Sequence, residues 1–232
     1  MRELHARAQR DVPEVRHVRQ HDGVQLRVML TEEKLEKFAL DWRQRLGMRF
    51  NRIPDIMTII VKLKREFPSF NYRRVPDSEF PDKEAEWNSE TRILSLRESV
   101  FTAMQRGEPR ARLIVMEEIF HFLLGHQGIK NRAIRPNFKE RTNGKTKREE
   151  WEARRAAAAF LALQIDVDPT WDAKRVSEEF RISLLAATLR VSELRDMRRR
   201  AMGHKRKLPP EVLQFLRNAK AQGTRIITDL DD

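Results

Sequence analysis

The sequence predicts an α+β fold that is mostly helical and carries a small antiparallel sheet. Apolar residues recur at spacings of three and four over several long segments, which is the pattern of amphipathic helices. Between residues 70 and 100 the pattern changes to alternation around polar turns, which is typical of short strands. Charged residues make up 35% of the chain and hydrophobic ones 40%, so we expect many exposed helices around a modest core.

Four segments carry the strongest helical signals. Residues 30–47 begin with Thr31 before an acidic first turn and end at Gly47. Residues 53–67 place Pro54 at a helix start. A long helix is expected after the break at Gly107-Glu108-Pro109, and another over residues 147–165.

The remaining segments are expected to be strands, loops and short helices. "FNYRRV" and "EAEWNSETRILSLRESV" predict two or three short antiparallel strands. Residues 127–147 are polar and rich in turn formers, and we expect an exposed loop. We divide the chain into an N-terminal extension with one helix (1–50), a main domain (51–167), a helical segment (168–203) and a basic C-terminal tail with one helical patch (204–232).

Composition excludes several functional classes. The chain of 232 residues has no cysteine, which excludes disulfides, thiolate metal sites and cysteine nucleophiles. It begins without the apolar core of a secretory signal, and no apolar run approaches the roughly 18–20 residues of a membrane span. We therefore expect a cytoplasmic protein with no membrane partner. A net charge of +12 favours acidic partners.

The stretch "MEEIFHFLLGH", residues 116–126, is one residue away from a zinc-peptidase helix. Such a helix needs His-Glu-x-x-His, in which two imidazoles bind the metal and the glutamate activates a water. Here the order is Glu117-Glu118-Ile119-Phe120-His121. An acid pair beside a histidine is usually a solvated helix face, but the apolar neighbours predict that these acids point inward.

Helical geometry limits which side chains can meet. At about 100° per residue, Glu117 and Glu118 lie about 40° and 60° on either side of His121, so the three can converge on one point. His126 lies about 140° away and cannot easily join them while the helix stays regular. Its position after Gly125 indicates a helix end.

Two spaced blocks give the chain a family resemblance. "GEPRARLIVMEEIFHFLLGH", followed later by "EEWEARRAAAAFLALQIDV", resembles the ImmA/IrrE family of metallo-endopeptidases. That family shows a run like R-F-T-x-A-H-E-x-G-H-x-x-L-x-H and then a helix with E-A-N-x-F-A-A-x-L-L. The resemblance covers roughly residues 53–191 and implies a zincin-like metallopeptidase domain over residues 51–167, followed by a helix-turn-helix-like segment over residues 168–203.

The resemblance also implies roles for single residues. His121 matches the second metal-binding histidine, Glu118 the catalytic base and Glu152 the third metal ligand on the alanine-rich helix. Glu117 stands where the family has its first metal-binding histidine. Phe120 replaces a small residue, and Arg154 replaces the asparagine after Glu-Ala.

A set of Glu117, His121 and Glu152 is chemically able to bind a metal ion. Exchanging an imidazole for a carboxylate lowers the charge at zinc, weakens water activation and shifts preference toward manganese. Neighbouring Glu149 and Glu150 are not excluded as ligands. A di-iron site built on Glu118-x-x-His121 would need a second such motif, and the only other instance is Glu14 to His17.

The expected partners follow from the resemblance and from charge. The resemblance implies a zinc-dependent endopeptidase that cleaves a helix-turn-helix transcriptional repressor, for example in a stress response. The alternative is a catalytically inactive pseudo-peptidase that binds such a regulator or DNA. DNA would contact the basic run between Arg195 and Lys207, directly after the helix-turn-helix-like segment.

Overall fold

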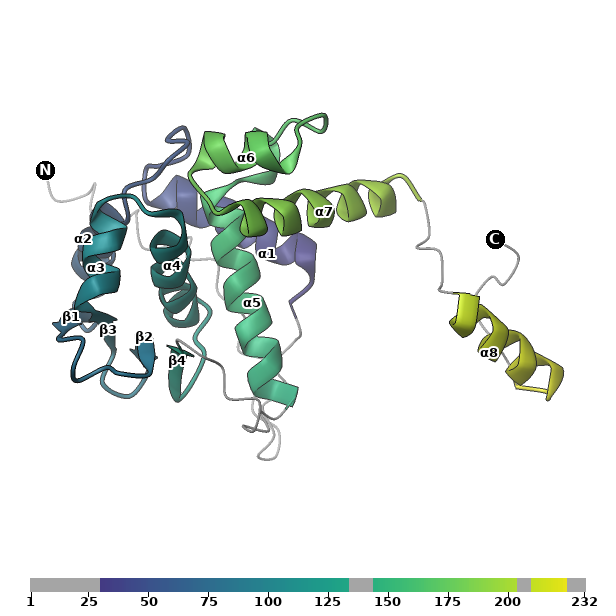
Figure 1. The fold of residues 1–232 in the computed structure, drawn as a ribbon, viewed down its shortest axis with the longest axis horizontal. Coiled ribbons are helices and arrows are strands. Elements are labelled where there is room, and N and C mark those ends of the chain that lie inside the picture. The colour runs from purple at the N-terminus through teal and green to yellow at the C-terminus, as the bar shows by residue number, and fades with distance from the viewer. Residues whose placement is uncertain (1–29, 134–143, 204–209, 225–232) are drawn as a thin grey trace, which may run out of the picture. The chain divides into compact units, whose positions relative to one another are not determined.

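The computed structural model describes residues 30–133, 144–203 and 210–224 and shows a mostly helical α+β protein. The chain divides into two compact units, residues 1–31 and residues 32–232, and nearly all of the first unit lies outside the described residues. The helices are α1 Glu32–Arg45, α2 Ile56–Glu66, α3 Glu98–Gln105, α4 Pro109–Leu123, α5 Gly144–Leu161, a 3₁₀ turn η1 Gln164–Asp166, α6 Ala173–Phe180, α7 Leu184–Ala201 and α8 Pro210–Ala221 (Figure 1).

The sheet is mixed rather than purely antiparallel. Its strands are β1 Asn71–Val75, β2 Lys83–Asn88, β3 Ile93–Arg97 and β4 Ile129–Ala133, in the order β1-β3-β2-β4. β2 pairs antiparallel with β3, as predicted, and also antiparallel with β4, whereas β1 pairs parallel with β3. The expectation of two or three antiparallel strands was therefore correct only for the β2–β3 hairpin.

β4 corrects the prediction of an exposed loop over residues 127–147. This strand reads Ile-Lys-Asn-Arg-Ala and has no apolar alternation. Its first two residues reverse the usual pattern, because Ile129 is exposed while Lys130 is buried. A strand at the edge of a sheet can be specified by backbone pairing alone, so its side chains gave no strand signal.

The helices were predicted with small errors at their ends. α2 begins two residues after Pro54, because Asp55 is the N-cap and accepts a hydrogen bond from the backbone N–H of Thr58 at 2.7 Å. α5 begins at Gly144 and ends at Leu161, a few residues earlier at both ends than expected. α8 confirms the helical patch of the C-terminal region, and none of its residues is buried.

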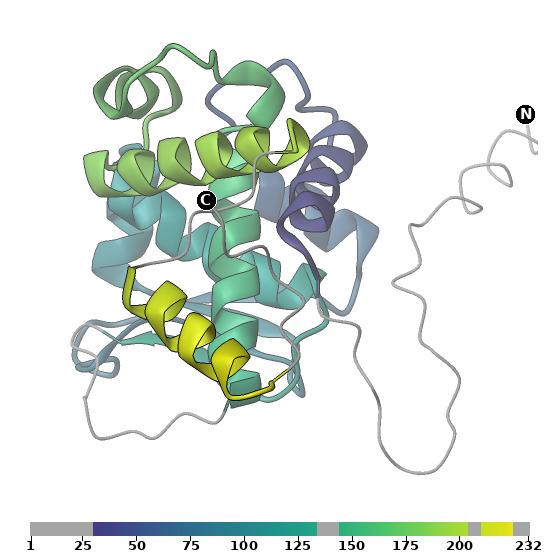
Figure 2. The same cartoon turned by 90° about the vertical axis from the view of Figure 1, so that its right-hand side faces the viewer.

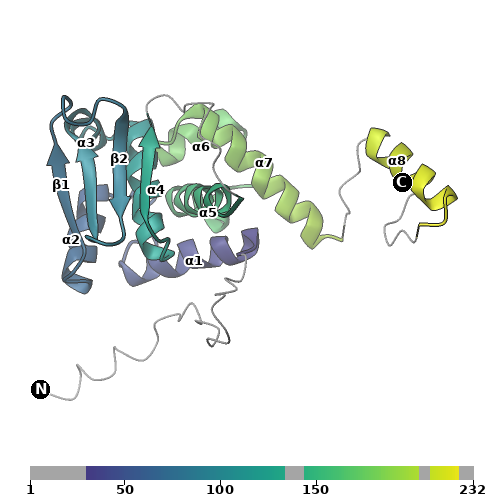
Figure 3. The same ribbon diagram turned by 90° about the horizontal axis from the view of Figure 1, so that it is seen from below.

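The main helices lie in layers on the sheet. α3 and α4 pack against the strands, α5 packs against α4, and α1 packs against α5 (Figures 1 and 3). The ring of Phe120 on α4 fills this interior, 5.7 Å from the ring of Phe160 on α5 and 6.2 Å from that of Phe38 on α1. In the described part of the chain, no helix is both long enough and apolar enough to cross a membrane.

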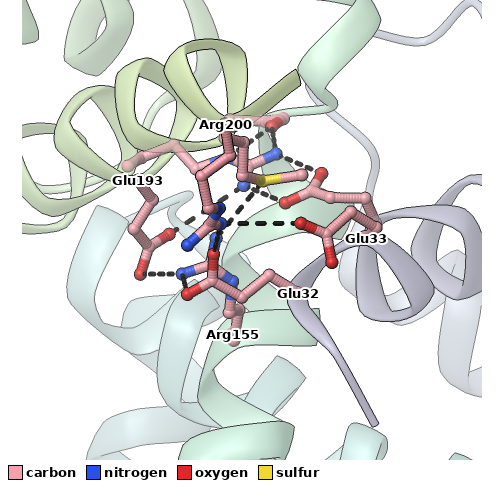
Figure 4. A network of polar contacts seen from close by, with 9 residues as sticks. Glu32, Glu33, Arg155, Glu193 and Arg200 are labelled. Carbon is pink, nitrogen blue, oxygen red and sulfur yellow. Dashed lines mark hydrogen bonds and ion pairs between the residues drawn. The ribbon is translucent and has the colours of Figure 1, made fainter. Parts of the chain in front are cut away.

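α7 crosses α5 (Figure 2) and is joined to α1 by buried charges. Arg155 of α5 lies 2.9 Å from Glu193 of α7 and 3.4 Å from Glu32 of α1, and Arg200 of α7 also contacts Glu32 (Figure 4). Burial raises the pKa of Glu193, against the opposing effect of Arg155 and Arg190. A network of ion pairs therefore connects α1, α5 and α7.

The centre of this network is the pair of Arg190 and Glu36. Arg190 is fully buried and donates from both terminal nitrogens to the carboxylate of Glu36, which is 7% exposed. Its Nε also donates to the carbonyl of Ala162 at 2.9 Å. A bidentate pair with additional carbonyl partners is the arrangement in which a buried arginine is best compensated.

We predict that Arg190→Leu lowers the free energy of unfolding by about 3–5 kcal/mol, because it leaves Glu36 buried without its cation. The double variant Glu36→Leu/Arg190→Leu should recover a large part of this loss, since both charges are then removed. Urea unfolding monitored by circular dichroism measures both. Arg199→Leu is the control, because Arg199 pairs with Asp196 on the exposed side of the same helix. A double variant no more stable than Arg190→Leu would contradict this account.

Candidate functional site

α4 is buried along most of its length, including its polar residues. Pro109 starts the helix, and all residues from Ala111 to His121 except Leu113 are buried. Glu117, Glu118 and His121 are 4%, 2% and 1% exposed, so the prediction that the acids point inward is confirmed. Buried charged groups need hydrogen-bond or ion-pair partners, and these partners define the geometry of the site.

Glu118 is bound to the sheet. Its Oε2 accepts a hydrogen bond from the backbone N–H of Trp87 at 3.0 Å. Trp87 lies in β2, between β3 and β4. The residue expected to act as the catalytic base therefore also anchors α4 to the central strand.

Glu117 turns to α5 and pairs with Arg154. The distance from Nε of Arg154 to Oε1 of Glu117 is 3.3 Å, and the side chain of Arg154 is half exposed. Arg154 is the residue that replaces the asparagine of the family pattern. Two of the three departures from that pattern thus face each other across the α4–α5 contact.

His121 meets His126. The prediction separated them only for a regular helix, and the expected helix end near Gly125 is present. α4 ends at Leu123, and Gly125 has a φ of +68°, which turns the chain back. The backbone N–H of His126 donates to the carbonyl of His121 at 2.9 Å, and the two Nδ1 atoms lie 2.7 Å apart. The 100° rule does not describe this contact, because it applies only while the helix continues.

The two imidazoles lie in a row between two carboxylates of α5. Nε2 of His121 is 3.5 Å from Glu150, and Nε2 of His126 is 3.4 Å from Glu152. Glu152 also receives a hydrogen bond from Nε of Arg148 at 3.1 Å. The structure therefore connects His121 to Glu152 only through His126, and it adds Glu150 on the other side of His121.

The contact between the imidazoles of His121 and His126 needs a proton on one of the two rings, because the contact between the two Nδ1 atoms is a hydrogen bond only when one of them carries a proton.

The arrangement does not fit a zinc ion. Zinc requires donor atoms that point to one centre about 2.0–2.2 Å away. His126 faces His121 with one nitrogen and Glu152 with the other, and these two nitrogens point in diverging directions. Within residues 30–133, 144–203 and 210–224, no group of three or more His, Asp or Glu side chains is arranged to hold a metal ion. Metal binding by Glu117, His121 and Glu152 stays a prediction.

Glu149, which was left open as a ligand, pairs with β4. Its carboxylate lies 2.7 Å from Nζ of Lys130, and both side chains are buried. The strand that the sequence did not predict thus supplies a cation to the same helix that carries Glu150 and Glu152.

Sequence reasoning missed His126 and left Glu150 without a role. A signal for His126 was present, because the family pattern closes with a histidine five residues after its second metal-binding histidine, and His126 stands five residues after His121. No comparable signal existed for Glu150.

α6 and α7 are joined by a short turn, in the segment for which the resemblance implies a helix-turn-helix-like unit. Arg181 adopts the left-handed conformation at the end of α6, and Ser183 caps α7 by accepting from the backbone N–H of Ala186 at 3.2 Å. The second helix exposes three large apolar side chains near its start, Leu184, Leu185 and Leu189.

Several arginines of the basic run are bound to the protein itself. Arg198 donates to the carbonyl of Val167 at 2.9 Å, Arg199 pairs with Asp196, and Arg200 pairs with Glu32. Residues 204–209, which include the rest of the predicted DNA contact up to Lys207, lie outside the described residues.

Comparison with known proteins gave no relative. No protein-family model matches the chain, and neither the curated proteins nor the solved structures contain a match. The resemblance to the ImmA/IrrE family therefore rests on the residues alone.

We predict a pH-dependent loss of stability for Glu150→Gln. Burial alone would raise the pKa of Glu150, but the hydrogen bond and charge of His121, with Lys130 and Arg154, outweigh it and lower the pKa. A lowered pKa means stabilisation that is present above the unfolded value of about 4.3 and lost as pH falls through the folded value. The variant should be less stable by about 0.5–1.5 kcal/mol at pH 7.

Urea unfolding between pH 7 and pH 3.5 tests this prediction. The difference between the two proteins should stay constant down to about pH 5 and shrink below about pH 4. Glu90→Gln, in the exposed β2–β3 turn, is the control for loss of one carboxylate. A difference that persists unchanged to the lowest pH would refute the assignment.

Proposed function

We propose that the chain is a metallopeptidase-like regulatory protein of the ImmA/IrrE type that acts by binding a helix-turn-helix transcription regulator. In this proposal the α4–α5 site is a closed polar core that holds the binding surface in shape and does not hydrolyse peptides. This is the pseudo-peptidase alternative drawn from the sequence.

The observation that carries the proposal is that each group of the peptidase motif has a protein partner. Glu117 pairs with Arg154, Glu118 accepts from the Trp87 N–H, and His121 lies between His126 and Glu150. Binding a metal would require these contacts to break inside a buried site. A buried polar group that loses its partner costs about 1–3 kcal/mol, so the closed arrangement resists such opening.

The exposed face of α7 favours a protein partner over DNA. A helix that reads DNA presents polar or basic side chains to base edges and phosphates. The start of α7 instead presents Leu184, Leu185 and Leu189. Apolar side chains at successive turns are the anchors by which one helix packs on another.

Metal-dependent cleavage is the second candidate. It is favoured by the short contacts that link His121, His126 and Glu152, because two histidines and one glutamate are the ligands of a common class of catalytic zinc site. In the observed arrangement these donors face one another rather than a common centre, so we derive no catalytic step from them.

We predict that protein purified without chelator and dialysed against zinc, and separately against manganese, retains well below about one equivalent of either metal. Glu117→His combined with Arg154→Asn should increase zinc retention, because it restores an imidazole and removes the competing cation. Elemental analysis after gel filtration measures both.

The same measurement separates the two candidate functions. About one equivalent of metal in the unaltered protein, lost in His121→Ala, would contradict the closed-core proposal and favour a peptidase. Absence of any gain in the double variant would mean that these residues do not descend from a zinc site.

We predict that Leu185→Glu abolishes capture of a helix-turn-helix regulator from extracts of the native organism, because a carboxylate cannot be buried in an apolar contact. Affinity purification with quantitative mass spectrometry compares the variant with the unaltered protein and with Val212→Glu on α8. The captured regulator should be full length. Recovery of cleaved fragments, or equal capture by Leu185→Glu, would contradict the proposal.

A further inference from the structure

α8 is a short helix whose two ends are specified by its own residues. Pro210 is its first residue, where a missing backbone N–H costs nothing. At the other end Gly223 has a φ of +86°, and its N–H donates to the carbonyl of Lys220 at 3.0 Å. The N–H of Thr224 donates to the carbonyl of Ala219, also at 3.0 Å, which completes a glycine-terminated helix end.

The same helix carries an exposed apolar stripe. At about 100° per residue, a sector of about 100° holds four apolar side chains, those of Val212, Phe215, Leu216 and Ala219. Phe215 is 70% exposed and Val212 40%, and none of the residues of α8 is buried. A helix of about 12 residues is marginal in water unless an apolar face packs on another surface, so α8 needs a surface that covers this stripe.

A groove of about 670 Å³ offers such a surface where the connection to α8 begins. It is formed by α1, the turn η1 and the last turns of α7, and its apolar lining consists of Leu40, Leu163, Ile165, Met197 and Ala201. Ile165 is 57% exposed in it. Arg200 and Glu33, which lie 3.5 Å apart, form part of its wall (Figure 4). An apolar groove is the kind of site into which an amphipathic helix lays its apolar face.

The length of chain between α7 and α8 allows this contact. α7 ends at Ala201, which itself lines the groove, and α8 begins at Pro210. The intervening residues 202–209 can span at most about 26–29 Å. The exposed leucines at the start of α7 lie farther away, since Leu189 is about 18 Å along the helix from Ala201. The groove is therefore the nearer of the two apolar surfaces for α8.

We propose that α8 docks into this groove of its own chain, with Phe215 and the rest of the stripe against Ile165 and Met197. A short connection holds α8 near the groove at millimolar effective concentration, which favours its own groove over that of a second copy. Docking covers apolar surface on both sides and closes the groove to other helices. This inference is independent of the proposed function, which uses the leucines at the start of α7.

Amide hydrogen exchange of the full chain, measured by mass spectrometry on peptides that cover α8, tests the proposal. An undocked helix of this length opens freely and exchanges close to the intrinsic rate, whereas a docked helix is protected. We expect the amides of α8 to exchange at least about tenfold more slowly than the intrinsic rate. This protection should not change on dilution, because the contact is made within one chain.

Variants assign the protection to the two apolar surfaces. Phe215→Glu in the stripe and Ile165→Glu in the groove should each return the amides of α8 to about the intrinsic rate, because a carboxylate cannot be buried in an apolar contact. Gln214→Glu, on the polar side of α8, and Leu185→Glu, at the start of α7, are the matched controls and should leave the protection unchanged. If circular dichroism shows that Ile165→Glu is misfolded, Ala201→Glu, at the exposed end of α7, is the second groove variant.

Three outcomes would overturn the proposal. Exchange at the intrinsic rate in the unaltered chain would mean that α8 does not dock. Protection that survives both Ile165→Glu and Ala201→Glu, or that is lost in Leu185→Glu, would place α8 on another surface. Protection that disappears on dilution, together with a dimer in sedimentation velocity, would place α8 in the groove of a second copy.

Discussion

The structure depends on one constraint: α4 is enclosed by the sheet and by α5, yet it carries charged and polar side chains that must all find partners. An amphipathic helix would turn such residues to solvent, but α4 is buried on every side. The surrounding elements therefore supply the partners. β2 provides a backbone N–H, α5 provides Arg154 and Glu150, and the turn after Gly125 provides His126.

This constraint explains why elements that look unrelated in the sequence occur together. β4 places Lys130 against Glu149, which balances one of the three acids that α5 points toward the site. α5 follows the same rule at Arg155, which is buried beside acids of α1 and α7. α5 thus contributes to two polar networks in which buried charges have partners of opposite charge.

The sequence was sufficient for the features that depend on local chemistry. The long helices, the β2–β3 hairpin and the inward direction of Glu117 and Glu118 were all predicted from periodicity, capping and apolar context. What failed depended on contacts distant in sequence. The parallel pairing of β1 with β3 and the edge strand β4 are set by backbone hydrogen bonds, which leave no side-chain pattern. The contact of His121 with His126 depends on a single turn at Gly125, which helical angles could not describe.

Two of the three departures from the pattern of the resembled family, Glu117 on α4 and Arg154 on α5, lie in one ion pair. Glutamate in place of histidine at position 117 alone would bury an anion between helices, at a substantial free-energy cost. Arg154 alone, where the resembled family has asparagine, would be a cation without this carboxylate beside it. Together they form the ion pair of Glu117 and Arg154, in which each compensates the other. In the proposal of a closed polar core, this ion pair is one of the contacts that a bound metal ion would have to displace.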